Sequence, residues 1–225
     1  MSPVIQHKSR SLPIVQQADA AANRSRASYG DRDHCHVELR RFDPASDSFD
    51  DLTDMLHRSF ERLGSMGLNC TCVDQSAAVT RVRALRGTCY IAVCNGRIVG
   101  TMTLYARDWY SPCELYRSDG IASIRQFAVD PAYQGKGIGK LMLAFAEHWA
   151  ATRGYAELAL DTPRPAAHLI AFYRGQGFRI AALARMPGKR YQSAILSKPA
   201  DASRALATTW SLSIESPRRD AARAA

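Results

Sequence analysis

One stretch of the sequence, from Ile124 to Leu141, constrains the fold more than any other. It opens with an apolar run typical of a strand. That run stops at Asp130-Pro131, because proline removes a backbone donor and bends the chain. Apolar residues then recur at three- and four-residue spacing, which predicts a helix from about Gly137 to Arg153. The apolar positions of this helix are Ile138, Leu141, Met142, Phe145 and Trp149.

Between this strand and this helix lie three glycines, together with Lys136 and Lys140. Glycines let bare N–H groups approach a ligand closely, and a helix N-terminus is positive, so we expect an anionic phosphate here. The spacing excludes a Walker loop, since Lys140 is followed by Leu141, and it lacks the third glycine of a dinucleotide fingerprint. A glycine turn that only caps the helix is the alternative interpretation.

A second motif runs from Ala171 to Phe178, where Tyr173 at a helix end is followed four residues later by Gly177-Phe178. With Gln134-x-x-Gly137-x-Gly139 after a strand that ends in Val-Asp-Pro, it resembles the signatures of the GNAT superfamily of acyl-CoA N-acyltransferases. The resemblance covers about residues 36 to 197 and includes an Asn95-Gly96 hairpin upstream.

The resemblance implies an α/β GNAT fold, with a mixed central sheet of about six to seven strands flanked by about four helices. It implies acetyl-CoA as co-substrate, with the pantetheine arm on the backbone of Phe127, Ala128 and Val129. The pyrophosphate would lie on the N–H groups that follow. These belong to Gln134, Gly135, Lys136, Gly137, Ile138, Gly139 and Lys140.

The resemblance also implies a chemistry, in which the acetyl group passes directly to a primary amine of a small molecule or peptide. Tyr173 would donate a proton to the departing CoA sulfur, and a backbone N–H near Phe127 would hold the oxyanion. An aromatic ring packed beneath a helix end also explains Tyr173, and one ring can do both. No Cys or Ser is framed by a His and a carboxylate, so we expect no acyl-enzyme.

The sequence departs from the family pattern at three places. Gln134 stands where many members have Arg, Ala166 where many have Asn, and Arg125 or Gln126 where some have a Glu base. No general base is therefore assigned. The candidates are Glu114, Asp119, His148 and His168, and the side chains that could hold a cationic amine are Asp108, Glu114 and Asp119.

Two other functions stay open. A catalytically silent module that binds acyl-CoA or has a regulatory role would explain the missing strand carboxylate. In either case we expect a monomer or a homodimer. Transfer to a protein N-terminus or lysine rests on analogy alone. Turnover with an amine panel and a Tyr173→Phe variant would separate an enzyme from a silent module.

Composition narrows the remaining classes. The 225 residues suffice for one well-buried domain, and the net charge of +9 suits a groove for a nucleotide-bearing cofactor. We expect neither nucleic acid nor a membrane as partner, because nucleic-acid motifs and long apolar runs are missing. The six cysteines show no metal spacing, and Cys89 and Cys94 are expected to be buried free thiols of a cytoplasmic protein. The alternative to a cytoplasmic location is an organelle, because residues 1 to 30 have a weak transit-peptide character.

The element pattern completes the prediction. We expect a flexible extension over residues 1–34, a domain over 35–199 and a tail over 200–225. Strands are predicted for His36–Phe42, Thr88–Cys94, Arg97–Ala106, Ile121–Val129, Ala156–Asp161, Phe178–Ala184 and Arg190–Ser197. Other helices are predicted from Asp47 or Ser48 to Arg62, over Asp74–Leu85 with Ala78, Val82 and Leu85 inside, and over Ala166–Arg174. Trp210, Leu212 and Ile214 alternate, which fits either an edge strand or a loose tail.

Overall fold

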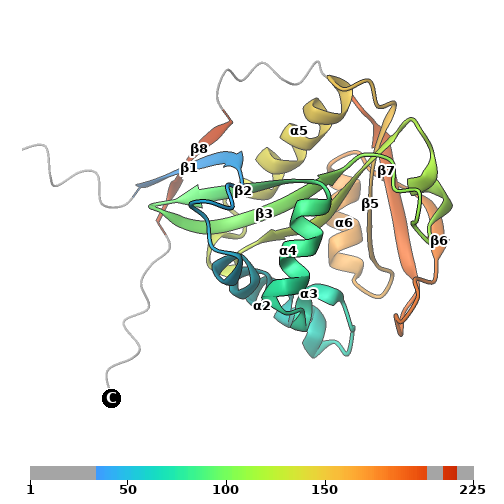
Figure 1. Cartoon of the computed structure of the whole chain (residues 1–225), viewed down its shortest axis with the longest axis horizontal. Helices are drawn as coiled ribbons and strands as arrows, with labels where there is room; N and C mark the ends of the chain where they lie inside the picture. The colour runs from blue at the N-terminus through green and yellow to red at the C-terminus, as the bar shows by residue number, and fades with distance from the viewer. Residues whose placement is uncertain (1–33, 202–209, 217–225) are drawn as a thin grey trace, which may run out of the picture. The chain divides into compact units, whose positions relative to one another are not determined.

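The computed structural model describes residues 34–201 and 210–216, and one eight-stranded sheet organises them. The strand order is β6-β7-β5-β4-β3-β2-β1-β8, so β6 and β8 form opposite edges (Figure 1). Within these residues, β4 and β5 run parallel, and the other registered pairs are antiparallel. The strands are β1 (His34–Arg41), β2 (Thr88–Cys94), β3 (Arg97–Tyr105), β4 (Ile121–Val129), β5 (Glu157–Pro163), β6 (Arg179–Ala184), β7 (Ser193–Pro199) and β8 (Ser211–Glu215).

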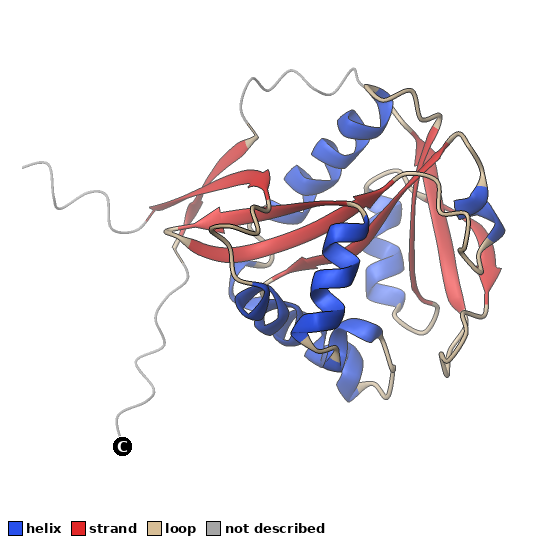
Figure 2. Cartoon of the chain, in the orientation of Figure 1, coloured by secondary structure: helices blue, strands red, loops and turns tan. Residues whose placement is uncertain are grey.

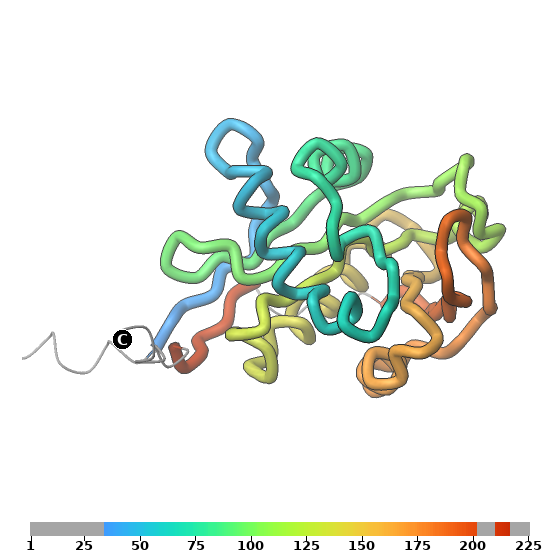
Figure 3. Tube along the Cα trace, turned by 90° about the horizontal axis from the view of Figure 1, so that it is seen from below, coloured from blue at the N-terminus to red at the C-terminus, as the bar shows by residue number. Residues whose placement is uncertain are grey.

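Five α-helices in the described residues flank this sheet (Figure 2). They are α2 (Phe49–Ser65), α3 (Thr71–Asp74), α4 (Ala77–Arg86), α5 (Ile138–Ala151) and α6 (Ala167–Gly175), with short 3₁₀ turns η1 (Glu114–Arg117) and η2 (Pro131–Tyr133). Seen from below, α2 and α4 lie on one side of the sheet and α6 on the other (Figure 3). The mixed α/β sheet predicted from the sequence is confirmed.

Each face of the sheet carries its own hydrophobic core. On the α2 and α4 side, Leu52, Met55 and Leu56 pack with Ile91 and Cys89. On the α5 and α6 side, the larger core joins α5 to the inward side chains of β2 to β5 and β7. Its members include Met102, Leu104, Met142, Leu158 and Leu196. The alternation of sides along each strand assigns neighbouring residues to different cores.

Two elements exceed the predicted number. The short α3 lies in a stretch interpreted as loop and helix start, and β8 adds an eighth strand. Of the two alternatives for residues 210–214, the structure forms the strand, with the Leu39 N–H donating to the Trp210 carbonyl at 2.9 Å. Figure 1 shows β8 beside β1. The predicted extension lies outside the described residues, except for His34.

The inward face predicted for α4 is wrong. Val82 and Leu85 are 67% and 52% exposed, whereas Thr80 and Ala84 are buried. Thr80 turns inward because its hydroxyl accepts hydrogen bonds of 2.7 Å from both Thr53 and Gln75. These polar contacts fasten α4 to α2 and outweigh the pattern of its apolar residues.

The Asn-Gly hairpin is confirmed in place and in conformation. Asn95 and Gly96 join β2 to β3 and adopt φ values of 52° and 75°. Such positive values are what a two-residue hairpin turn requires of both central residues. The prediction succeeded because its cause is local.

The expectation of a free thiol at Cys94 is wrong. Cys94 forms a disulfide with Cys35, whereas Cys89 is free and buried as predicted. The two bridged residues lie 59 positions apart, and only the antiparallel pairing of β1 with β2 brings them together. Cys70, Cys72 and Cys113 are also free and buried.

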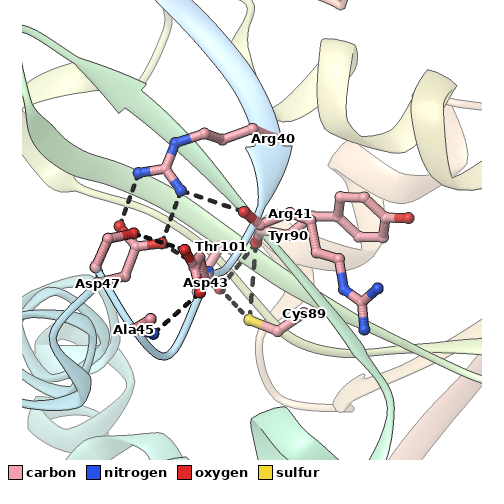
Figure 4. A network of polar contacts seen from close by, with 9 residues as sticks. Arg40, Arg41, Asp43, Ala45, Asp47, Cys89, Tyr90 and Thr101 are labelled. Atoms are coloured by element: carbon pink, nitrogen blue, oxygen red, sulfur yellow. Dashed lines mark hydrogen bonds and ion pairs between the residues drawn. The ribbon is translucent and has the colours of Figure 1, made fainter.

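A polar network closes the end of β1 (Figure 4). Both terminal nitrogens of Arg40 donate to the Asp47 carboxylate at 2.7 Å, and Asp47 also accepts from the Asp43 N–H at 2.8 Å. This bidentate pairing ties the strand to the turn that leads into α2. The α2 N-terminus is then capped by Ser48, whose hydroxyl accepts from the N–H groups of Asp50 and Asp51.

Two features are absent from the described part of the chain. None of its helices is long and apolar enough to cross a membrane. Within the same residues, His, Cys, Asp and Glu side chains form no group of three or more that could hold a metal ion.

Candidate functional site

The site begins where β4 and β5 stop pairing. The two strands are registered only at Ile121–Glu157, Ala122–Leu158 and Ser123–Ala159. Beyond these pairs β4 stays with β3, while β5 stays with β7 along its whole length. A cavity of about 1320 Å³ is lined by the separated halves of both strands. The sheet therefore opens at its middle.

A bulge shapes the β4 side of this opening. The register with β3 shifts between Thr101 and Thr103, and Gln126 takes φ = 49°, a value that few residues other than glycine adopt. Gln126 is buried, and its amide oxygen accepts a 3.4 Å hydrogen bond from Thr103. The next three residues, Phe127, Ala128 and Val129, line the cavity on the side that β5 has left.

The glycine turn forms an adjoining wall of the same cavity, because all seven residues from Gln134 to Lys140 line it. Gly137 is the N-cap of α5 with φ = 88°, so the first N–H groups of α5 have no helical partner. A Cβ on Gly139 would lie 3.4 Å from the Phe172 ring. The amide of Gln134 donates to the Val129 carbonyl at 3.0 Å, which links the turn to the end of β4.

The turn is fastened from behind by Asp130. This buried carboxylate accepts two bonds from Arg58 of α2, at 2.8 and 3.1 Å, and one from the Ala132 N–H at 3.1 Å. Arg97 lies 3.7 Å away. The aspartate that ends the motif strand thus positions the turn relative to α2.

Tyr173 of α6 reaches the same cavity. Its side chain is buried among the rings of Phe127, Phe172 and Phe178, and it lines the cavity wall. Within the described residues, its hydroxyl makes no hydrogen bond with another side chain or the backbone. Burial raises the pKa of Tyr173, and the charge of Asp161 adds to the rise. The phenol therefore stays protonated at neutral pH.

Sequence reasoning missed Asp161, which lies on β5 and lines the cavity. Its Oδ1 accepts from Arg125 at 2.5 Å and from the Tyr116 hydroxyl at 3.1 Å. No hydrogen bond to Oδ2 is found in the described part of the chain. A single charged residue at the end of the apolar run Leu158–Leu160 was the available signal.

Arg125 occupies a position on β4 where a base was considered. It is mostly buried, pairs with Asp161 and stacks 3.8 Å from the centre of the Tyr116 ring. Burial raises the pKa of Tyr116 well above its ordinary value, and Asp161 adds to this. β4 thus carries a cation at a position where a Glu base was considered.

Of the other polar residues predicted for the site, two line the cavity and three do not. Asp108 and His168 line it, and Asp108 pairs with Arg86 at 2.6 Å. Burial lowers the pKa of His168, and Arg62 lowers it further. The remaining three do not line the cavity: Glu114 lies on η1, Asp119 pairs with Arg107, and His148 packs 5.7 Å from Trp210. Ala166 is buried beneath α6 and also lies outside the cavity wall.

Comparisons with known proteins identify the family and the fold. Residues 50–178, more than half of the chain, match the model of the Acetyltransferase (GNAT) family. No curated protein matches the sequence.

Three solved structures share the fold at low identity. The ribosomal-protein-S18-alanine N-acetyltransferase from Escherichia coli is 18% identical with a TM-score of 0.55, over 73% of this chain and 94% of that one. A Bacillus subtilis acetyltransferase in complex with CoA is 19% identical with a TM-score of 0.52, over 72% and 98%. An Elizabethkingia anophelis GNAT family acetyltransferase with acetyl-CoA bound is 18% identical with a TM-score of 0.51, over 72% and 97%. On the family match and this architecture, the chain belongs to the GNAT family of acetyltransferases.

Proposed function

We propose that this protein is an N-acetyltransferase that passes the acetyl group of acetyl-CoA directly to a primary amine of a small molecule or peptide. One observation carries the proposal. β4 and β5 separate after Ser123 and Ala159, and a buried phenol with no hydrogen-bond partner in the described residues lines the resulting cavity. This arrangement offers strand backbone and a proton donor on one surface.

The cofactor half of the cavity fits an extended pantetheine arm and a diphosphate. Phe127, Ala128 and Val129 have no partner strand on the β5 side, so backbone groups there can pair with an amide-bearing arm. The Val129 carbonyl already accepts from the Gln134 side chain, which leaves Phe127 and Ala128 as the main partners. The N–H groups from Gln134 to Lys140 lie at a helix N-terminus, where an anion is favoured. The B. subtilis and E. anophelis structures, which carry CoA and acetyl-CoA, support this choice of ligand.

The chemistry then needs three groups of this chain. Acetyl-CoA supplies the acyl group as a thioester. A backbone N–H near Phe127, turned by the bulge at Gln126, holds the thioester oxygen as negative charge develops on it. As the C–N bond forms and the C–S bond breaks, Tyr173 gives its proton to the sulfur and regains one from solvent. The acceptor attacks as the neutral amine, so an ammonium first loses one proton to water, and the nitrogen loses a second proton to water as the amide forms.

Asp161 is proposed to hold the acceptor nitrogen. A carboxylate is far less basic than an alkyl amine, whose ordinary pKa is about 10.4, so attraction of the ammonium is its more effective role. The unpartnered Oδ2 is available for that contact, while Oδ1 stays with Arg125 and Tyr116. The anchor would place the nitrogen beside the phenol of Tyr173.

Release of free CoA thiol from acetyl-CoA tests the proposal, with polyamines, aminoglycosides, amino acids and short peptides as acceptors. At least one amine should raise the release well above hydrolysis, and mass spectrometry should find the acetyl group on its nitrogen. A Tyr155→Phe variant is the matched control, because Tyr155 stacks on Trp149 and does not line the cavity.

A catalytically silent acyl-CoA-binding module remains the second candidate. The ion pair between Arg125 and Asp161 favours it, since the carboxylate whose charge acts on the phenol is already engaged. Calorimetry would then find CoA binding, while no amine or peptide, including N-terminal peptides, would release thiol above hydrolysis. Amine-dependent release would exclude it.

A further inference from the structure

The cavity extends beyond the cofactor half to a second wall, the acceptor wall. It is formed by α2, α3, α4, the end of β3 with the loop after it, the neighbouring parts of β4 and β5, and the turn between β6 and β7. Three carboxylates lie on this part of the cavity, from Glu61, Asp108 and Asp161. Cationic side chains are twice as many. They are Arg58, Arg62, Arg83, Arg86, Arg125 and Lys189.

Three of these six cations form ion pairs with carboxylates. Arg86 pairs with Asp108, Arg125 pairs with Asp161, and Arg58 pairs with Asp130. Arg62, Arg83 and Lys189 have no carboxylate partner among the residues the structure describes. Arg62 is exposed, so water solvates it, but the other two are partly withdrawn from solvent.

Arg83 and Lys189 converge on the first turn of α3. The Arg83 guanidinium donates to the Gln75 amide oxygen at 2.5 Å and to the Cys72 sulfur at 3.2 Å. The Lys189 ammonium donates to the Thr71 hydroxyl and the Asn69 carbonyl, both at 2.8 Å. Their anchors, Thr71 and Cys72, are consecutive residues, so two cations from distant segments approach one place.

All four anchoring groups are neutral, so the charges of both cations remain uncompensated. Withdrawing a cation from water costs free energy unless an anion or strong hydrogen bonds replace the lost solvation. Gln75 and Thr71 hold the two side chains in place, and the guanidinium keeps donors that face no partner in the described part of the chain. Such a pair is prepared to receive an anionic oxygen.

The acidic and basic parts of the wall line one cavity, to which Asp161, Arg83 and Lys189 all contribute. Burial raises the pKa of the Cys72 thiol. The charges of Arg83 and Lys189 oppose this rise, whereas the charge of Asp161 adds to it. The same carboxylate also acts on Tyr173 at the cofactor half. An ammonium beside Asp161 and an anion beside Arg83 would therefore lie within one acceptor site.

We infer that the acceptor is a primary amine that also carries an anionic group, a carboxylate or a phosphate, bound by Arg83 and Lys189. The inference rests on the proposed function and specifies its substrate class. The amine end approaches Asp161 and the thioester, and the anionic end lies at the first turn of α3. Neutral amines of the same size lose the second contact.

The test compares acceptors that differ only in the anionic group. The pairs are L-phenylalanine with L-phenylalaninamide, β-alanine with β-alaninamide, and O-phosphoethanolamine with ethanolamine. In at least one pair the anionic member should have a kcat/KM at least tenfold higher. The first two pairs report a carboxylate and the third a phosphate.

Variants of the two cations test the same preference. Arg83→Gln and Lys189→Gln should each reduce the preference for the anionic acceptor severalfold. Arg81→Gln, on the same helix but outside the cavity wall, should keep it.

A binding measurement separates the inference from the proposed function. Ligand-observed NMR with 3-phenylpropionate and 3-phenylpropionamide, in the presence of CoA, needs no turnover. Acid binding that is lost in Arg83→Gln supports the anion site even if no amine is acetylated, which would refute only the proposed function. Equal kcat/KM and binding for acids and amides in the wild-type protein would overturn the inference, whether or not the variants fold.

Discussion

Tyr173 is the residue on which the proposed chemistry depends most. Its ring packs against three phenylalanines, so the structural role suggested by the sequence is real, and its hydroxyl is left for the cavity. One side chain can therefore serve both the packing and the proposed proton donation. Helix α6 sets the position of the ring, and the hydrophobic core on that side of the sheet surrounds it with apolar side chains.

Replacement of Tyr173 by Phe should lower kcat by about 10²-fold or more, because a positioned general acid contributes that much. The ring remains, so CoA affinity and thermal stability should stay near the wild-type values. Steady-state kinetics and calorimetry with CoA measure the two effects. An unchanged kcat would remove Tyr173 from the mechanism, and Tyr155→Phe controls for the loss of a phenol elsewhere.

The pH dependence follows from the direction of the Tyr173 shift. Burial raises the pKa of this phenol, so the protonated, donating form persists above the ordinary value of about 10. The high-pH decline of kcat should therefore begin above pH 10. A pH–rate profile that falls between pH 7 and 9 in the wild type, and not in Tyr173→Phe, would contradict the assignment.

Asp161 makes a different prediction, because it acts on the acceptor. Asp161→Asn should raise the KM for the amine about tenfold or more, while the affinity for CoA is retained. Some loss of stability is expected too, since Arg125 keeps its charge in a mostly buried place without its partner. The matched control is Asp119→Asn, whose side chain pairs with Arg107 outside the cavity wall.

At the scale of elements, the helices and strands that carry the site are held by close contacts at their ends. Gly87, between α4 and β2, shows this clearly. A Cβ there would come within 2.6 Å of the Leu104 carbonyl and 2.3 Å of the Tyr105 ring. Because one of these atoms belongs to the backbone, the neighbour cannot move away easily.

Gly87→Ala should therefore destabilise the fold by about 2 kcal/mol, within the range found for overpacked sites. Urea unfolding measures the change. Gly175→Ala is the matched control, because a Cβ at Gly175 would meet nothing within 4 Å, and stability should stay the same or rise. Equal stability of the two variants would contradict the contact described.

The Arg40–Asp47 pair gives an element-scale dependence on pH. The hydrogen bonds from Arg40 lower the pKa of Asp47 below its ordinary value of about 3.9. The stabilising effect is therefore present above pH 4 and is lost as the pH falls through the native-state pKa. Arg40 is 36% exposed, so solvent screening limits the contribution to about 1 kcal/mol or less.

Asp47→Asn should accordingly lower the stability at pH 7. Between pH 4 and pH 2, the stability of the variant should fall less than that of the wild type, because the titrating carboxylate is gone. Thermal melting across this range measures the difference. Asp54→Asn, an exposed position on α2 with no ion pair among those the structure shows, serves as the control.

At the scale of the whole molecule, the sheet joins segments that are far apart in sequence. Its middle strands hold the cavity, and the disulfide between Cys35 and Cys94 closes a 59-residue separation at the β1 side. Thiol titration in denaturant should count four reactive cysteines before reduction and six after it. Reduction should lower the free energy of unfolding by about 2–4 kcal/mol. Six thiols from the start would contradict the bridge.

Comparison with the sequence shows where local reasoning suffices. The Asn95-Gly96 turn, a cap at Asp47 or Ser48 and the helix that follows the glycine turn were all predicted, because each depends on neighbours within a few positions. The structure places the cap at Ser48. The inward face of α4 was not predicted, because a hydrogen bond between Thr53 and Thr80 joins two helices. Hydrophobic periodicity contains no information about such a partner.

The site divides in the same way. The sequence alone determined where the motif strand ends, where the glycine turn lies and where the following helix begins, since local conformation and spacing specify them. Tyr173 was singled out by the family resemblance, and its role stays a prediction. Tertiary structure alone decided that Asp161 pairs with Arg125 and that Arg83 and Lys189 both bind the first turn of α3. These pairings join side chains from separate elements, so they depend on how the sheet orders its strands, which no short pattern encodes.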